Sequence, residues 1–217
     1  HTTTASASQT EPKGATSQQA APAQEPVAQQ DDPEGPVEPE DLTPQPVKKT
    51  RGTLTIAFGR FNPPTIGHEK LANKIKEVAR KENANPRIYL SHTQNPKKDP
   101  LSYNDKYRFA TKAFGIVKRS QSKQIFQILP EIEKEGFTDI IMVVGSDRIK
   151  EFDRVLQKYN GKDYNFNSIK TVSSGDRDPD AQGVEGMSGS KLRGVAMGGD
   201  EKTFKSGLAS KLSDADK

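Results

Sequence analysis

The chain has 217 residues, a formal charge of +4, 31% hydrophobic residues and no cysteine. The lack of cysteine excludes a disulfide scaffold, a thiolate metal site and a cysteine nucleophile. No apolar run reaches the roughly 18 residues that a membrane-spanning helix needs, so we expect a soluble protein.

Residues 1–50 differ in composition from the rest of the chain. They contain eight of the fifteen prolines and no Phe, Tyr, Ile or Met, so they have little apolar surface to bury. We predict a disordered arm, which acts as a passive linker or as a tether to a large protein assembly. Eight acidic residues against three lysines give the arm −5 and leave +9 for the remainder. That surplus suits a phosphate-rich ligand, whereas scattered basic residues and an acidic arm argue against nucleic acid.

From residue 51 onward, short β-prone runs alternate with amphipathic helical patterns. The predicted strands cover residues 54–58, 87–92, 124–129, 139–144 and 168–173. Five helices are predicted. They are one that begins near Gly67, one over 103–117, a short one near Glu131, one from about 148 to 159, and one through Leu192 and Val195.

This alternation predicts an α/β fold over residues 51–198. We expect a Rossmann-like parallel sheet of about five strands with helices on both faces, and ligands at the carboxyl ends of the strands. Residues 199–217 should add a helix or tail through Phe204 and Leu208 and then fray.

The loop after the first predicted strand, residues 59–68, reads Gly-Arg-Phe-Asn-Pro-Pro-Thr-Ile-Gly-His. A glycine at the start of the next helix lets a ligand approach the free main-chain amides, where the helix dipole attracts phosphate. His68, in the first turn, offers a donor at the same place. The residues alone predict an anion site, with a structural histidine at a helix start as the alternative.

This loop resembles the first signature of the HIGH-type, or cytidylyltransferase-like, nucleotidyltransferase superfamily. In those enzymes His-x-Gly-His or Thr-x-Gly-His lies between the first strand and the first helix. The resemblance implies that Thr65 and His68 contact the triphosphate. It also assigns four neighbouring residues to nucleotide binding: Gly59, Arg60, Phe61 and Gly67.

Residues 186–193, Gly-Met-Ser-Gly-Ser-Lys-Leu-Arg, resemble the second signature of the superfamily, Ile-Ser-Ser-Thr-x-x-Arg. In the superfamily this segment opens a helix, its hydroxyls and amides hold the β- and γ-phosphates, and the arginine neutralises the leaving pyrophosphate. Ser188, Ser190 and Arg193 take these roles by resemblance. An N-cap at Ser188 or Ser190 is a simpler role that is compatible with them.

Gly145 and Asp147 follow the strand predicted at 139–144, where the superfamily often has residues near the base and ribose. The alternative is that Ser146 or Asp147 caps the next helix, which we expect to begin at Arg148.

Three residues after the second strand are further candidates. Lys97 and Lys98 either contact phosphate or lie in an exposed basic loop, and His92 is a candidate contact of the acceptor. The acidic residues of the 176–180 stretch have no spacing typical of a metal cage, so we expect loop residues and no protein metal site: Asp176, Asp178 and Asp180.

The resemblance implies transfer of a nucleotidyl group from a nucleoside triphosphate to a phosphate-bearing acceptor, with release of pyrophosphate. His68 and Arg193 are then the catalytic residues, which stabilise charge on the α-phosphate and on the leaving group. Mg²⁺ is expected as cofactor, held mainly by the nucleotide phosphates.

Within the superfamily the chain resembles nicotinamide-mononucleotide adenylyltransferase-like proteins of tailed bacteriophages. This favours ATP over CTP as donor and a cytoplasmic or virion-associated location. The alternative from another class is a non-enzymatic structural or assembly protein, for example of a phage particle, that retains the fold.

Overall fold

The computed structural model describes residues 51–175 and 187–217. The arm predicted for residues 1–50 lies outside the described residues, so its disorder stays a prediction. Within the described ranges, every helix is too short or too polar to cross a lipid bilayer.

The centre of the fold is a four-stranded parallel sheet. Its strands are β1 (Thr53–Gly59), β2 (Asn85–Leu90), β3 (Asp139–Val144) and β4 (Ser168–Ser173), in the order β2-β1-β3-β4. Every neighbouring pair is parallel. Parallel neighbours need crossover connections, which the helices supply, so the predicted α/β class is confirmed.

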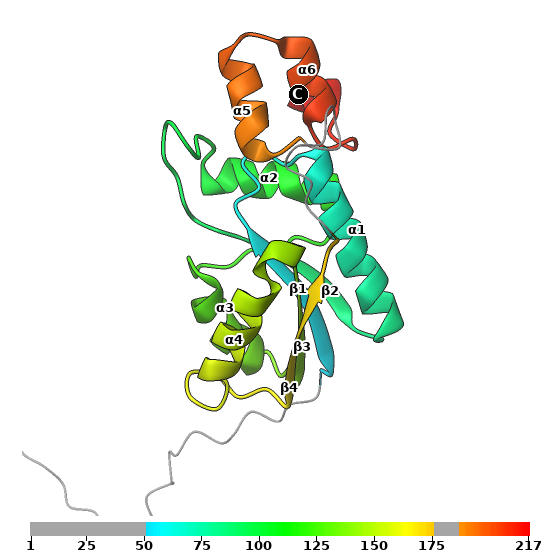
Figure 1. The fold of residues 1–217 in the computed structure, drawn as a ribbon, viewed down its shortest axis with the longest axis vertical. Helices are drawn as coiled ribbons and strands as arrows, with labels where there is room; N and C mark the ends of the chain where they lie inside the picture. Colours follow the sequence, from blue (N-terminus) through cyan, green and yellow to red (C-terminus); the bar gives the residue numbers. More distant parts are fainter. Residues whose placement is uncertain (1–50, 176–186) are drawn as a thin grey trace, which may run out of the picture. The chain divides into compact units, whose positions relative to one another are not determined.

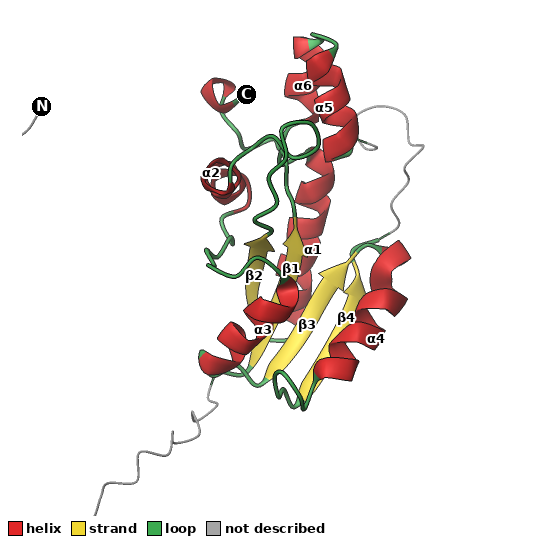
Figure 2. Ribbon diagram, turned by 90° about the vertical axis from the view of Figure 1, so that its left-hand side faces the viewer, coloured by secondary structure: helices red, strands yellow, loops and turns green. Residues whose placement is uncertain are grey.

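Helices cover both faces of the sheet (Figures 1 and 2). On one face, α1 (Ile66–Lys81) and α2 (Tyr103–Phe114) pack with alternate strand residues such as Ala57 and Ile88. On the other face, α3 (Ile125–Lys134) and α4 (Ile149–Tyr159) pack against strand residues such as Ile56 and Met142. Successive strand residues point to opposite faces, which is why β1 contributes to both cores.

The strand predicted at 124–129 is wrong, because these residues belong to helix α3. Ile125, Ile128, Leu129 and Ile132 are all buried and lie at helical spacing, so they form one apolar stripe on the sheet. The apolar run is too short for its periodicity to separate a strand from a helix. The helix predicted near Glu131 is the second half of α3.

The helix predicted over 103–117 ends earlier, at Phe114. Gly115 adopts a left-handed conformation with φ 71°, which glycine tolerates and which ends the helix. The chain then forms an isolated parallel bridge between Val117 and Ile88 of β2. The Ile88 amide donates to the Ile116 carbonyl at 2.8 Å, and the Lys118 amide donates back at 2.9 Å. This single bridge lies beside β2, the outer strand of the sheet, in the position that a fifth strand would occupy.

The C-terminal part contains α5 (Gly189–Met197) and α6 (Glu201–Gly207). Residues 208–212 then return to the core, where Leu208, Ala209 and Leu212 are buried with α1 and α2 side chains. Residues 208–212 thus pack on α1 and α2. The fraying expected after Leu208 stays a prediction.

Candidate active site

The predicted site residues gather around one edge of the sheet, where the strands end. β1 leads at Gly59 into the loop that starts α1, and β2 leads at Leu90 into a long loop before α2. α5 lies on the same side of the sheet as these loops (Figure 2). In parallel sheets this edge is where ligands bind.

Gly59 is required by the way the first loop folds back. A Cβ atom at this position would lie 2.8 Å from Cε2 of Phe61, whose ring is buried against the end of β1. The same ring contacts the imidazole of His68, with centroids 4.5 Å apart and planes tilted by 37°. Gly59 and Phe61 thus form the support on which His68 rests.

His68 is also fixed by Thr65, the N-cap of α1. The Thr65 amide donates to His68 Nδ1 at 3.0 Å, and the Thr65 hydroxyl is 3.0 Å from the same nitrogen. An amide can only donate, so this bond assigns Nδ1 as the acceptor and places the ring proton on Nε2. Thr65 is buried and acts on His68 directly; its predicted contact with phosphate stays a prediction.

Asn62 links the two signature segments, and the sequence reasoning gave it no role. Its side chain accepts from the Leu101 amide at 3.3 Å and donates to the Leu101 carbonyl at 3.5 Å. Its main-chain carbonyl accepts a 2.6 Å hydrogen bond from Arg193 Nη1. An asparagine between an aromatic residue and two prolines was the sequence signal that could have indicated a structural polar contact.

The second signature opens a helix, as its resemblance predicted. Ser188 is the N-cap of α5 and accepts from the Lys191 amide at 3.2 Å. Ser190 accepts from Arg193 Nη2 at 3.0 Å. Arg193 therefore uses both terminal nitrogens to fix its guanidinium between its own helix and the first loop. The N-cap role is confirmed for Ser188, and contacts with phosphate stay predictions.

The start of α5 packs closely on the first loop. A Cβ atom on Gly189 would lie 3.2 Å from the Asn62 carbonyl oxygen and 3.4 Å from Arg193 Nη1, so glycine makes room for this hydrogen bond. Gly67, in the first turn of α1, lies next to the carbonyl of Met187. The structure therefore brings the two signatures together, and the N-termini of two helices meet there.

The loop after β2 presents Lys97 and Lys98 on a tight turn. Asn95 and Asp99 exchange main-chain hydrogen bonds of 2.9 and 2.8 Å. The Asn95 side chain accepts from the amides of both lysines, whose side chains are exposed. Asp99 is buried and lies 3.5 Å from the guanidinium of Arg60. The turn thus holds two cations at the carboxyl end of β2.

Lys106 is a second residue that sequence reasoning missed. It has 0% exposure, and its ammonium donates to the carbonyls of Ser91 at 2.6 Å and Thr93 at 2.8 Å. Burial lowers its pKa below the ordinary value, with the charge of Asp99 opposing that shift. The signal was available, because Lys106 lies three residues after Tyr103 and four before Ala110, within the buried stripe of α2.

His92 is held by structural contacts. Its Nε2 lies 2.9 Å from the Ser120 carbonyl oxygen, and its ring stacks on Tyr103 with centroids 3.8 Å apart. These contacts attach the end of β2 to α2 and to the segment before α3. Its predicted contact with the acceptor stays a prediction.

Gly145 and Asp147 lie at the carboxyl end of β3, as expected. Gly145 precedes a short 3-10 helix, η1 (Ser146–Arg148), and Arg148 is the N-cap of α4. Neither helix start has a side-chain cap, so the alternative that Ser146 or Asp147 caps the next helix is wrong. Asp147 is exposed at this edge of the sheet, and contact with a base or ribose stays a prediction.

Over the ranges 51–175 and 187–217, no three His, Asp or Glu side chains converge as a metal site would require. The three aspartates that we expected to be loop residues lie outside those ranges: Asp176, Asp178 and Asp180.

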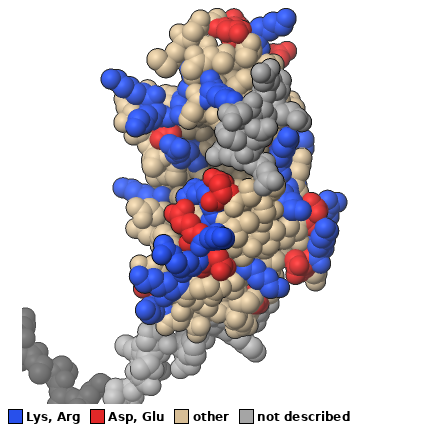
Figure 3. Space-filling view, viewed as in Figure 1, with Lys and Arg blue, Asp and Glu red and all other residues tan. Residues whose placement is uncertain are grey.

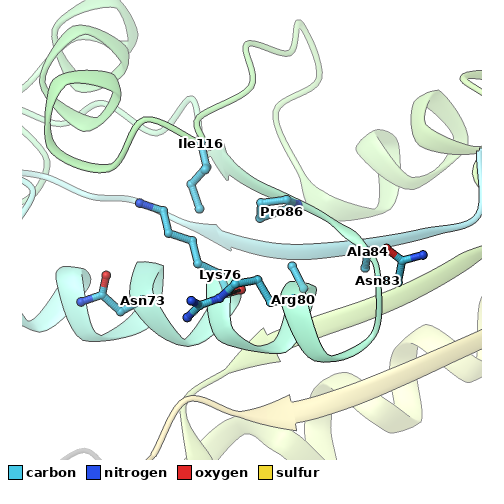
Figure 4. Close-up of a pocket in the computed structure, with 8 residues that line it drawn as sticks. Asn73, Lys76, Arg80, Asn83, Ala84, Pro86 and Ile116 are labelled. Atoms are coloured by element: carbon cyan, nitrogen blue, oxygen red, sulfur yellow. Dashed lines mark hydrogen bonds between the residues drawn. The ribbon is translucent and has the colours of Figure 1, made fainter.

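A pocket of about 750 Å³ lies at the opposite end of the sheet (Figure 4). Ala79, Ala84 and Ile116 contribute apolar surface, and Lys76 and Arg80 contribute charge. Along α1, Arg80 is about 18 Å from His68 at 1.5 Å per residue, so this pocket does not belong to the candidate site.

Basic side chains do not form one continuous band on the face shown in Figure 3. Lys and Arg form several separate groups there, with Asp and Glu between them. A long nucleic acid would need a basic track along its backbone, which this face does not provide. The charge of the site is instead local, from side chains at the strand ends.

The family model of cytidylyltransferase-like proteins matches residues 56–194, which include both signature segments. The chain belongs to the cytidylyltransferase-like family. Membership supports a nucleotidyltransferase in general terms and agrees with the position of the two signatures at the sheet edge.

No curated protein matches this chain. Among solved structures, it is similar to the nicotinic acid mononucleotide adenylyltransferase of Plasmodium falciparum complexed with NaAD. The identity is 14%, the TM-score is 0.43, and the match covers 71% of this chain and 94% of that chain. The family assignment rests on the family model alone.

Proposed function

We propose that this protein transfers a nucleotidyl group, adenylyl from ATP, to a phosphate-bearing acceptor and releases pyrophosphate. The observation that carries the proposal is the 2.6 Å hydrogen bond from Arg193 Nη1 to the Asn62 carbonyl. It holds a guanidinium and the N-terminus of α5 against the loop that positions His68. An imidazole donor, a cation and two helix N-termini are suited to a triphosphate.

In this reaction an acceptor oxygen attacks the α-phosphorus while the bond to pyrophosphate breaks. Negative charge builds up on the α-phosphoryl oxygens and on the leaving group. The Nε2–H of His68 would donate to an α-phosphoryl oxygen. Arg193, Ser190 and the amides at the start of α5 would bind the departing phosphates. Catalysis would then come from positioning and from preorganised donors, with no covalent intermediate.

Mg²⁺ would be held mainly by the phosphates and water, since Asp99, the buried carboxylate of this site, is a poor ligand. Asp99 is buried beside Arg60 and the ammonium of Lys106, which already offset its charge. When bound, the cation would neutralise phosphate charge and align the triphosphate. The protein residues would supply the remaining donors.

Calorimetric titration of the full chain with ATP and with CTP, each with Mg²⁺, tests the proposal. We expect one ATP site. His68→Ala and Arg193→Ala should weaken its affinity for ATP, whereas Lys202→Ala, which removes an exposed cation on α6, should leave the affinity unchanged. Binding of CTP alone would overturn the adenylyl assignment. Binding of neither nucleotide would overturn the proposal. If ATP binds, a pyrophosphate-release screen identifies the acceptor.

A further inference from the structure

The segment after α6 pairs with the loop that precedes His68. Leu208 forms an isolated antiparallel bridge with Thr65, and the Ala209 amide donates to the Pro64 carbonyl at 3.2 Å. Leu208, Ala209 and Leu212 are buried beneath this contact. Main-chain pairing and apolar burial together fix residues 208–212 on the first signature.

A side-chain contact fastens the same segment on the other side of His68. Oε1 of Glu69 accepts from the Ser210 amide at 2.6 Å and from the Ser210 hydroxyl at 2.7 Å. Two donors on one carboxylate oxygen make a charge-assisted contact, which is stronger than a neutral one. Glu69 lies in the first turn of α1, immediately after His68. We call residues 208–212 with their partner Glu69 the C-terminal clamp.

The clamp acts on His68 through Thr65. The residue that bridges to Leu208 is the one whose amide donates to His68 Nδ1 at 3.0 Å. If the clamp opens, the main chain at 64–65 loses its contacts with Leu208 and Ala209, and the amide can move away from the ring. The imidazole then loses the bond that keeps its proton on Nε2.

We propose that Glu69 and Ser210 are positioning residues that hold His68 in the Nε2–H tautomer and in its orientation toward a bound triphosphate. The catalytic part of this inference rests on the proposed function. The tautomer itself is a property of the protein without substrate, so it can be measured whether or not the protein binds ATP.

The chain offers a matched control in a second contact of the C-terminal part. Lys112 on α2 forms an ion pair with Asp216 at 2.5 Å. This pair attaches the same region of chain, but its partner is α2 and not the loop at 64–69. Lys112→Met should therefore affect stability without affecting the tautomer of His68.

The test is a long-range ¹H–¹⁵N spectrum of the imidazole nitrogens in the full, uniformly ¹⁵N-labelled chain. The chain has three histidines, and His68→Asn identifies the signals of His68. We expect an unprotonated Nδ1 and a protonated Nε2 in the wild type and in Lys112→Met. In Glu69→Ala the two nitrogen shifts should move toward each other as the tautomers exchange. Glu69→Gln, which keeps an acceptor oxygen, should restore the wild-type shifts.

Turnover gives the second measurement. We expect Glu69→Ala to lower kcat by roughly 10- to 100-fold, in line with misplacement of one catalytic group. Ser210→Ala, which keeps the amide donor, should have a smaller effect and provides a folded variant if Glu69→Ala does not fold. Wild-type His68 shifts in both variants would overturn the clamp, as would equal changes in Lys112→Met. Altered shifts in a chain that binds no triphosphate would overturn the proposed function and leave the clamp standing.

Discussion

Arg193 and Asn62 are joined by a 2.6 Å hydrogen bond although 131 residues separate them in the chain. Asn62 in turn bonds through its side-chain amide to the main chain of Leu101, in the loop after β2. One buried asparagine thus links the loop after β1, the loop after β2 and the start of α5. The loop after β1 therefore contacts both of the other segments through this one residue.

Arg193→Ala should weaken triphosphate handling more than it weakens the fold. The guanidinium donates to the Asn62 carbonyl and the Ser190 hydroxyl through two separate nitrogens, a fork that the single, differently placed ammonium of lysine does not reproduce. We therefore expect Arg193→Lys to restore only part of the loss. Steady-state kinetics of pyrophosphate release should show a raised KM for ATP in both variants. An unchanged KM would show that Arg193 only holds the loop in place and does not contact ATP.

His68→Ala should lower kcat by roughly 10²- to 10³-fold, the usual cost of one preorganised donor to transition-state charge. His68→Asn is the matched variant, because an asparagine oxygen can replace Nδ1 as acceptor for the Thr65 amide but offers nothing at the position of Nε2. We expect it to be as inactive as alanine and more stable to urea. Wild-type turnover in His68→Asn would show that Nε2 has no catalytic role.

Lys106→Met should lower the free energy of unfolding by about 1–3 kcal/mol at neutral pH, because two carbonyls lose their shared donor. The difference should grow as pH rises. The pKa of native Lys106 lies below 10.5 because of burial, so between that pKa and 10.5 the unfolded chain binds more protons and wild-type stability gains with pH. Urea titrations at several pH values measure this, with Lys170→Met as the exposed control. A difference independent of pH would contradict the prediction.

The wild type should lose stability at alkaline pH because of Tyr164, and Tyr164→Phe should abolish that part of the loss. Burial raises the pKa of Tyr164 from 10.0 to about 12, and its hydroxyl donates to the Leu156 carbonyl at 2.8 Å. The unfolded chain loses this proton first, so wild-type stability falls between these two values by up to about 1.4 kcal/mol per pH unit. Phenylalanine should cost about 1 kcal/mol near pH 7 and make the alkaline slope shallower. Identical slopes would show that Tyr164 ionises normally.

The sequence predicted those parts of the fold whose cause is local. β3 and β4 have the predicted bounds, 139–144 and 168–173, because each is a short β-prone run between clear helical or turn segments. The start of α1 was predictable for the same reason, since strand, glycine, prolines and helix follow one another. α3 was misread because Ile125, Ile128 and Leu129 fit both a short strand and one face of a helix.

The candidate site was predictable in its residues but not in its connections. Resemblance selected His68 and Arg193, whereas the bond from Arg193 to Asn62 depends on tertiary placement that no local pattern encodes. Lys106 was passed over because a lysine is normally exposed, and only the neighbouring carbonyls of Ser91 and Thr93 make its burial tolerable.

The contact between Glu69 and Ser210 spans 141 residues, nearly the whole of the folded part of the chain. On a ribosome, the loop that carries His68 is made well before its partner segment, residues 208–212. Until then Leu192 and the α1 face lack the cover that Leu208 and Leu212 provide. The nascent chain should therefore gain the ability to bind nucleotide only after residues 208–212 have been made, and nascent chains halted before residue 208 should be targets for chaperones.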